Sequence, residues 1–152
     1  RLLQPGPRQR LGRVTQQGPR APPERSREEA DLREPEGGLL APGARLVDVR
    51  TSAEWQWVGK VPDAVQIEWN MSNGQRNPDF LAQLKHQVDP ESLVMFLCRS
   101  GGRSHGAASI AAEAGYSNAY NILEGFEGDL DASGQRNTVG GWRKAGLPWS
   151  QS

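Results

Sequence analysis

Short apolar runs recur along the chain at intervals that leave room for a helix or a turn between them. Most of them are short and follow turn residues such as Gly, Pro or Asp, a pattern typical of strands. One run is apolar at successive positions, as in a central parallel strand that is covered on both faces. We therefore predict strands at residues 45–49 (RLVDV), 64–67 (AVQI), 92–97 (SLVMFL) and 118–123 (NAYNIL).

Helical patterns fill the intervals between these runs. TSAE at residues 51–54 has the form of a capping box, and NPDFLAQLKHQV at residues 77–88 has helical apolar spacing with Asn77 as its predicted cap. Residues 104–115 (SHGAASIAAEAG) are rich in alanine and end in a glycine. The alternation of strands and helices predicts an α/β fold with a parallel sheet.

The two ends of the chain carry weaker patterns. SREE at residues 26–29 is a further capping box that predicts a short helix, and a final short helix is predicted from about Trp142. Residues 1–25 are rich in Pro and Gly and have no periodic apolar face. We expect a disordered leader over residues 1–25 and one folded domain over residues 26–152.

The charges are unevenly distributed although the formal net charge is zero. The first 27 residues carry seven arginines and one acidic residue, so the remaining chain has an excess of six acidic residues. No apolar run is long enough to span a bilayer and no signal-peptide region is visible, which favours a soluble, cytoplasmic protein. We expect neither a membrane nor a nucleic acid as a partner.

Cys98 is the only cysteine, and it directly follows the apolar run at residues 92–97. A single cysteine cannot form an intramolecular disulfide, and together with His86 and His105 it makes a poor set of zinc ligands. We expect no metal and no cofactor. In parallel α/β sheets, ligands bind beyond the carboxyl ends of the strands, and Cys98 is predicted to lie at such an end.

The loop after Cys98 is suited to activating a thiol. Gly101 and Gly102 allow a tight curl in which the N–H groups of successive residues converge on one point at the start of the next helix. The helix dipole and the guanidinium groups of Arg99 and Arg103 would favour the thiolate, which is the reactive form. We therefore interpret Cys98 as a nucleophile, and a buried, inert thiol is the alternative.

The loop CRSGGRS at residues 98–104 resembles the active-site loop of single-domain rhodaneses. The resemblance extends over about residues 44–149 and includes LVDVRTSAEW, GKVPDAVQI, NILEGFEG and GWRKAGLPW. It implies a parallel five-stranded sheet flanked by helices. It also implies a sulfurtransferase in which Cys98 carries sulfane sulfur as a persulfide, from a small anionic donor such as thiosulfate to cyanide, a thiol or a protein sulfur carrier.

The chain departs from the pattern of that family in two places. Lys60 and Asp63 occupy a turn that usually reads Gly-His-Ile-Pro-Gly-Ala, and residues 128–140 are added before the last predicted helix.

Four residues of the loop besides the glycines are candidates for binding the anion. Arg99 and Arg103 are close enough to attract an anionic donor, and we expect Arg103 to point inward. Ser100 and Ser104 could bind the anion or could simply serve the turn and the helix cap.

Three residues outside the loop are candidates for the rim of the pocket. Trp69 could line its mouth, Glu124 could accept hydrogen bonds that hold the loop closed, and His105 could act as a base or could be an ordinary surface histidine. Asp48 and Arg50 look catalytic in isolation, but the family resemblance places them beside the site as an ion pair of the scaffold.

Other functions compete with sulfur transfer. Cysteine-dependent phosphatases and arsenate reductase-like enzymes use a Cys-x5-Arg loop, whereas Cys98 and Arg103 are separated by four residues, which gives a smaller ring of amides. A rhodanese-like module that binds or regulates without turnover would have no need to keep Cys98 and its loop together. A disulfide reductase is disfavoured because the chain has no second cysteine.

Overall fold

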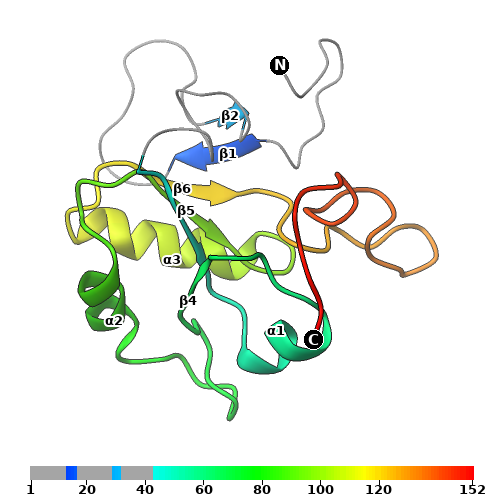
Figure 1. Ribbon diagram of the computed structural model, residues 1–152, viewed down its shortest axis with the longest axis horizontal. Coiled ribbons are helices and arrows are strands. Elements are labelled where there is room, and N and C mark those ends of the chain that lie inside the picture. Colours follow the sequence, from blue (N-terminus) through cyan, green and yellow to red (C-terminus); the bar gives the residue numbers. More distant parts are fainter. Residues whose placement is uncertain (1–12, 17–28, 32–42) are drawn as a thin grey trace.

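The computed structural model describes residues 13–16, 29–31 and 43–152 (Figure 1). In chain order its elements are β1 (Arg13–Gln16), β2 (Glu29–Asp31), β3 (Arg45–Asp48), α1 (Ser52–Trp57), β4 (Val65–Gln66), α2 (Phe80–Gln87), β5 (Val94–Leu97), α3 (Gly102–Glu113) and β6 (Ala119–Ile122).

One sheet runs through the molecule with the strand order β2-β1-β6-β5-β3-β4. The four strands β4, β3, β5 and β6 are parallel, and the three helices that follow β3, β4 and β5 connect them. β1 pairs with β6 in antiparallel orientation, and β2 pairs with β1 in the same way. The α/β class is confirmed, but the expected number of five parallel strands is corrected to four, because the strand beside β6 comes from the start of the chain and runs the other way.

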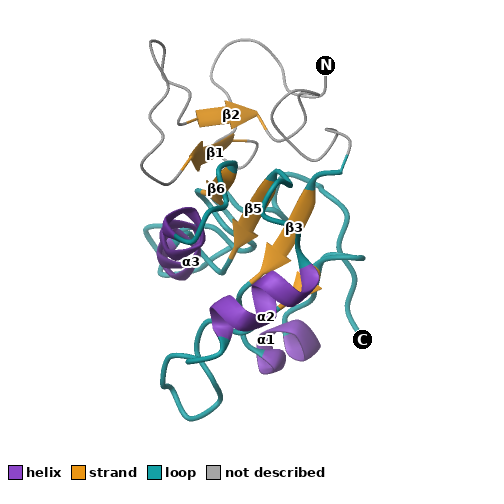
Figure 2. Cartoon of the chain, turned by 90° about the vertical axis from the view of Figure 1, so that its left-hand side faces the viewer, coloured by secondary structure: helices purple, strands orange, loops and turns teal. Residues whose placement is uncertain are grey.

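Two helices pack on one face of the sheet (Figure 2). α2 contributes Phe80 and Leu84, and α3 contributes a stripe of fully buried alanines that includes Ala107 and Ala111. These helices cover Val47, Val94 and their neighbours on the strands. Because the alanine side chains are small, α3 lies close to β5 and β6, and its first turn is held against the end of β5.

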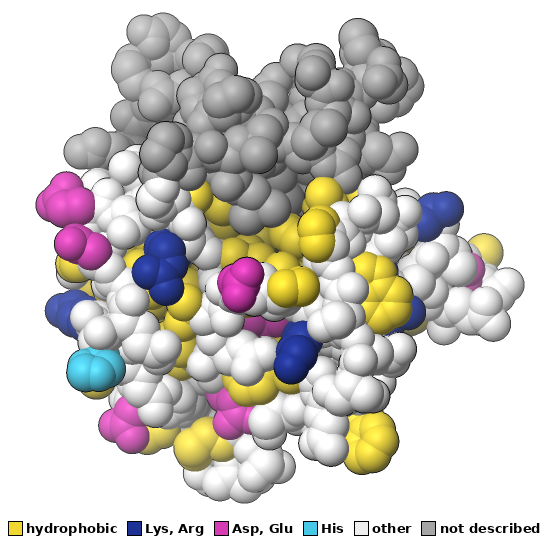
Figure 3. All heavy atoms as spheres, viewed as in Figure 1, with side chains coloured by type: hydrophobic (Ala, Val, Ile, Leu, Met, Phe, Trp, Pro, Cys, Tyr) yellow, Lys and Arg dark blue, Asp and Glu magenta, His cyan; other side chains and the backbone are white. Residues whose placement is uncertain are grey.

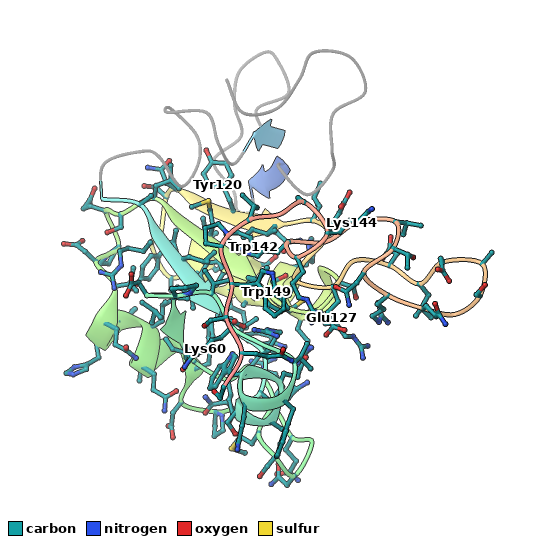
Figure 4. The ribbon with its side chains drawn as sticks, turned by 45° about the vertical axis from the view of Figure 1, so that its right-hand side comes forward. Lys60, Tyr120, Glu127, Trp142, Lys144 and Trp149 are labelled. Atoms are coloured by element: carbon teal, nitrogen blue, oxygen red, sulfur yellow. The ribbon has the colours of Figure 1, made fainter. Side chains whose placement is uncertain are left out.

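The other face is covered mainly by the chain that follows β6. Phe126, Trp142 and Leu147 form one buried cluster with strand residues such as Met95 and Ile122. Figure 4 shows Trp142 on this segment, which runs across the sheet. The helix predicted from Trp142 is wrong: the segment makes a single turn, closed by a bond from the Ala145 N–H to the Gly141 carbonyl.

The first helix confirms its predicted capping box, whereas the cap of the second differs from the prediction. Thr51 and Glu54 exchange the two hydrogen bonds of a capping box at the start of α1. The N-cap of α2 is Asp79 rather than Asn77. The Asn77 side chain instead accepts a bond from the Asp79 N–H and donates one to the Glu68 carbonyl, so it fixes the turn that precedes the helix.

The predictions for the first 42 residues fall mostly outside the described residues. Within the leader predicted at residues 1–25, the structure describes only the strand β1. The helix predicted from residue 26 is wrong at Glu29–Asp31, which forms β2. The remainder of both predictions lies outside the described residues.

Among the helices that the structure describes, none is long and apolar enough to cross a membrane. On the face of the molecule shown in Figure 3, basic and acidic side chains are interspersed rather than gathered by sign.

The strand order places a topological switch point at the carboxyl ends of β3 and β5. From β3 the chain moves to β4 on one side, and β5 then lies on the other side of β3. The loops that leave β3 and β5 therefore diverge, and such a point is where ligands bind in open α/β sheets. Cys98 follows β5 at this end of the sheet.

Candidate functional site

Cys98 lies buried at the carboxyl end of β5, with 1% of its surface exposed. Its Sγ accepts a hydrogen bond from the Gly101 N–H at 3.1 Å and lies 3.2 Å from the Ser104 Oγ. Its carbonyl accepts a bond from the Phe126 N–H at 2.8 Å. The sulfur thus lies beside one backbone N–H and one hydroxyl group where α3 begins, and the chain after β6 holds the Cys98 backbone.

Gly101 and Gly102 play different parts in the loop. Gly101 is the N-cap of α3 and has φ = +105°, a conformation that favours glycine. A Cβ on Gly101 would also collide with the carbonyl oxygen of Leu123. Gly102 is exposed and has open space around its Cα. The tight turn predicted from both glycines therefore depends on Gly101.

A buried amide lies behind the loop. Asn121 of β6 is 3% exposed, its Oδ1 lies 2.6 Å from the Ser104 Oγ, and its Nδ2 donates to the Gly101 carbonyl at 3.2 Å. Asn121 is not among the site residues predicted from the sequence. A polar side chain in the otherwise apolar run AYNI was the available signal, because a buried polar group needs partners.

Arg103 points inward, as predicted, but it binds a carboxylate of the protein. Its guanidinium group makes a bidentate ion pair with Glu54 of α1, with N–O distances of 2.8 and 2.9 Å. Burial raises the pKa of Glu54, but hydrogen bonds from Arg103 and Thr51 outweigh it and lower the pKa to about 2. The hydrogen bond to Glu54 in turn raises the pKa of Arg103. The pair joins α1 to α3.

The other polar residues of the loop face outward to differing degrees. Arg99 is exposed, Ser100 is half-buried, and His105 is exposed on the first turn of α3. Arg99 therefore remains free to meet an anion that approaches from solvent. Among the described residues, the polar groups within hydrogen-bond distance of the sulfur are the Gly101 N–H and the Ser104 hydroxyl.

Trp69 lies in the core beside the loop rather than openly at its mouth. Its ring packs edge-on against Phe80 at 5.0 Å, and a Cβ on Gly106 would come within 3.0 Å of it. The guanidinium group of Arg76 lies 3.9 Å from the centre of the same ring. Arg76 is a second residue that sequence reasoning did not identify, and it places a positive charge over Trp69.

Glu124 holds the chain that follows β6. Its Oε1 accepts a bond from the Gly141 N–H at 3.1 Å, which anchors the segment after the added residues 128–140.

Asp48 and Arg50 form a fully buried ion pair at 2.7 Å. Arg50 also donates to the Gly59 carbonyl and lies 4.1 Å from the ring centre of Phe126. These contacts fit the part in the scaffold that the resemblance implies.

The described residues include no group of three or more His, Cys, Asp or Glu side chains that could hold a metal ion. The site places one sulfur atom at the N-terminus of a helix. Backbone N–H groups and a hydroxyl can stabilise negative charge on such a sulfur and on a group attached to it.

Comparisons with known proteins identify the family of the chain. A family model described as "Rhodanese-like domain" matches residues 30–132. An uncharacterized protein of Rickettsia conorii is 38% identical over 112 residues, which cover 70% of this chain and 82% of that protein. The protein named thiosulfate sulfurtransferase 16, chloroplastic, of Arabidopsis thaliana is 30% identical over 113 residues, or 72% of this chain and 82% of that protein.

A solved structure matches as well. The crystal structure of Rv0390 from M. tuberculosis superposes with a TM-score of 0.67 and 52% sequence identity, covering 74% of this chain and 87% of that one. Together with the family model, which spans more than half of the 152 residues, this similarity establishes the family. The chain belongs to the rhodanese-like domain family.

Proposed function

We propose that the protein is a sulfurtransferase that moves sulfane sulfur from a small anionic donor such as thiosulfate to a thiophilic acceptor, through a persulfide on Cys98. The observation that carries the proposal is the position of the Cys98 sulfur, which faces the Gly101 N–H and the Ser104 hydroxyl at the start of α3. A relative that is named as a thiosulfate sulfurtransferase supports the choice of donor.

The proposed reaction has two displacements. The Cys98 thiolate attacks the outer sulfur of thiosulfate, so that an S–S bond to Cys98 forms and sulfite leaves with the electron pair of the broken S–S bond. Cyanide then attacks the outer sulfur of the persulfide, which forms thiocyanate and returns the Cys98 thiolate. A small thiol or a protein sulfur carrier could take the place of cyanide.

The residues of the loop have separate parts in this scheme. Donors at the N-terminus of α3 stabilise the negative sulfur at each stage, because the hydrogen bonds act in a site from which water is largely excluded. Arg99, which is exposed, attracts the anionic donor. The burial of Cys98 favours a slender donor over a bulky one.

A phosphatase or arsenate reductase is less well supported. In such an enzyme the guanidinium group of Arg103 would bind a phosphoryl group. Here both of its terminal nitrogens donate hydrogen bonds to the Glu54 carboxylate. A module without turnover is disfavoured by the chemical suitability of the loop around Cys98.

The test is the intact mass of the protein after incubation with thiosulfate. Because Cys98 is the only cysteine, we expect a gain of one sulfur atom in the natural chain, its removal by cyanide, and no gain in Cys98→Ser. An oxygen cannot form the persulfide, which is why the variant loses transfer altogether.

Two results would contradict the proposal. One is an unchanged mass of the natural chain after incubation with thiosulfate or with a persulfidated small thiol, and the other is a gain of sulfur that persists in Cys98→Ser. Hydrolysis of an aryl phosphate, or protection of Cys98 from alkylation by phosphate or arsenate as well as by thiosulfate, would favour phosphoryl chemistry instead.

A further inference from the structure

One side chain contacts both groups that face the Cys98 sulfur. The Asn121 amide donates to the carbonyl of Gly101, whose N–H points at the sulfur, and its oxygen lies 2.6 Å from the Ser104 hydroxyl. All four residues are buried, so bulk water does not provide ready substitutes for these bonds.

The orientation of the Asn121 amide follows from its neighbours. The Gly101 carbonyl can only accept, so the NH2 group of Asn121 faces it and the amide oxygen faces Ser104. The amide oxygen can only accept as well. The short contact to Ser104 therefore requires the Ser104 hydroxyl to donate its proton to Asn121.

A hydroxyl group has one proton, and the Ser104 Oγ lies within reach of two acceptors. While that proton points to Asn121, the Ser104 oxygen can accept a hydrogen bond from the Cys98 thiol at 3.2 Å. When Cys98 loses its proton to solvent, the sulfur becomes an acceptor only. The Ser104 hydroxyl must then rotate toward the sulfur and leave the Asn121 oxygen.

We propose that Asn121 is a positioning residue that controls the charge of Cys98 through Ser104, by holding the Ser104 proton while Cys98 is a thiol and releasing it when Cys98 becomes a thiolate or a persulfide. No covalent bond of Ser104 or Asn121 changes in this step. The inference deepens the proposed function, on which it rests in taking Cys98 as the reacting group.

The charged groups around Cys98 are the same in both states of this switch. They lie on the loop, on α1, on α3, at the end of β3 and after β6, and they are Arg99, Arg103, His105, Glu54, Asp48, Arg50 and Glu124. None of them is altered by a substitution of Ser104 or Asn121. A change in the pH dependence of Cys98 in those variants therefore reports on the two substituted side chains.

The two side chains should act in opposite directions. In Asn121→Leu, which has a similar shape, the Ser104 hydroxyl has no competing acceptor and is free to donate to the thiolate. In Ser104→Ala, the thiolate loses a donor. The pH midpoint for alkylation of Cys98 by iodoacetamide should fall by about 0.7 unit in the first variant and rise by about 0.7 unit in the second, the shift that corresponds to one hydrogen bond of ordinary strength.

Three controls accompany this measurement. Ser109→Ala makes the same substitution further along α3, where the Ser109 hydroxyl bonds to the His105 carbonyl, and should leave the midpoint unchanged. Ser104→Thr keeps the hydroxyl and should restore the natural midpoint. The double variant Ser104→Ala/Asn121→Leu should match Ser104→Ala, because in the proposed switch Asn121 acts through Ser104 and not through its bond to the Gly101 carbonyl. Circular dichroism establishes that each variant folds, and Asn121→Ala takes the place of Asn121→Leu if the latter does not.

The proposal is overturned if both single variants shift the midpoint in the same direction, or if the Asn121 variants fold and leave it unchanged. If the two substitutions simply disordered the loop, both would shift the midpoint in the same direction. Alkylation uses no sulfur donor, so the outcome is independent of whether thiosulfate loads Cys98. Opposite shifts in a protein that gains no sulfur would support the switch and contradict the proposed sulfur transfer.

Discussion

At the scale of single residues, the active loop depends on a position that only glycine can occupy, as well as on its side chains. The curl of the loop requires a positive φ at Gly101 and an approach to Leu123 that leaves no room for a Cβ. The sequence indicates such a turn by its pair of glycines, but it cannot distinguish between them. The distinction arises from β6, which is remote in sequence and places the Leu123 carbonyl against one glycine only.

We predict that Gly101→Ala and Gly102→Ala differ sharply in stability. Gly101→Ala should lower the free energy of unfolding by at least about 2 kcal/mol, because it combines an unfavourable φ with a collision against backbone. Gly102→Ala should be neutral or stabilising by up to about 1 kcal/mol, because Gly102 is the first residue of α3 and has open space. Urea unfolding of both variants measures the difference, and equal losses would contradict the assigned roles.

At the scale of elements, the strands and helices from β3 to β6 were predictable because each carries its own pattern. Residues 93–97 are apolar throughout and contain β5, and TSAE formed the capping box of α1. The partner of Arg103 was not predictable, because Glu54 serves that local capping box and its second role appears only when α1 and α3 meet. The predicted helix from Trp142 failed because burial of that segment against the sheet overrode a weak local pattern.

The ion pair between α1 and α3 predicts a dependence of stability on pH. The pKa of Glu54 is lowered from 4.5 to about 2 in the folded protein, so the pair contributes its full stability above about pH 4.5 and loses it as the pH falls toward 2. Glu54→Gln should therefore cost about 1 kcal/mol at pH 7, a value reduced for the partial exposure of the pair. The difference between the two proteins should shrink as the pH is lowered from 4.5 to 2.

Chemical denaturation at several pH values measures this effect, provided that the natural chain remains folded at the lowest of them. Glu113→Gln on the exposed surface of α3 is the matched control and should change the stability by less than about 0.5 kcal/mol at every pH. A constant difference between Glu54→Gln and the natural chain across this range would show that the pair does not set the response to acid.

At the scale of the whole molecule, the two faces of the sheet are covered by different kinds of structure. α2 and α3 cover one face, and an irregular segment that ends near α1 covers the other, where Lys60 and Ser150 exchange two backbone hydrogen bonds. The sequence predicted the first layer from its helical periodicity. It could not predict the second, because that segment follows no local period and some of its contacts join residues 85 or 94 positions apart.

The tryptophans allow a test of this second layer. Trp142 belongs to this segment, packs into the buried cluster against the sheet and is 1% exposed. Its Nε1 donates to the Pro148 carbonyl at 2.7 Å. Trp57 at the end of α1 is 72% exposed. Trp142→Ala should lower the free energy of unfolding by about 3–5 kcal/mol, because it leaves a cavity between the segment and the sheet. Trp57→Ala removes a side chain of the same size from the surface and should cost less than about 0.5 kcal/mol.

Urea unfolding measures the difference in the free energy of unfolding between the two alanine variants. Trp142→Phe is a milder substitution that can be used if Trp142→Ala does not fold. Phenylalanine keeps most of the apolar contact but loses the bond to Pro148, so its cost should fall between those of the two alanine variants. If Trp142→Phe and Trp57→Ala were equally stable, the packing of Trp142 against the sheet would contribute little to the free energy of unfolding. The bond from the Phe126 N–H to the Cys98 carbonyl would then not be what holds Cys98 in place, and the pairing of β5 with its neighbouring strands would have to do so.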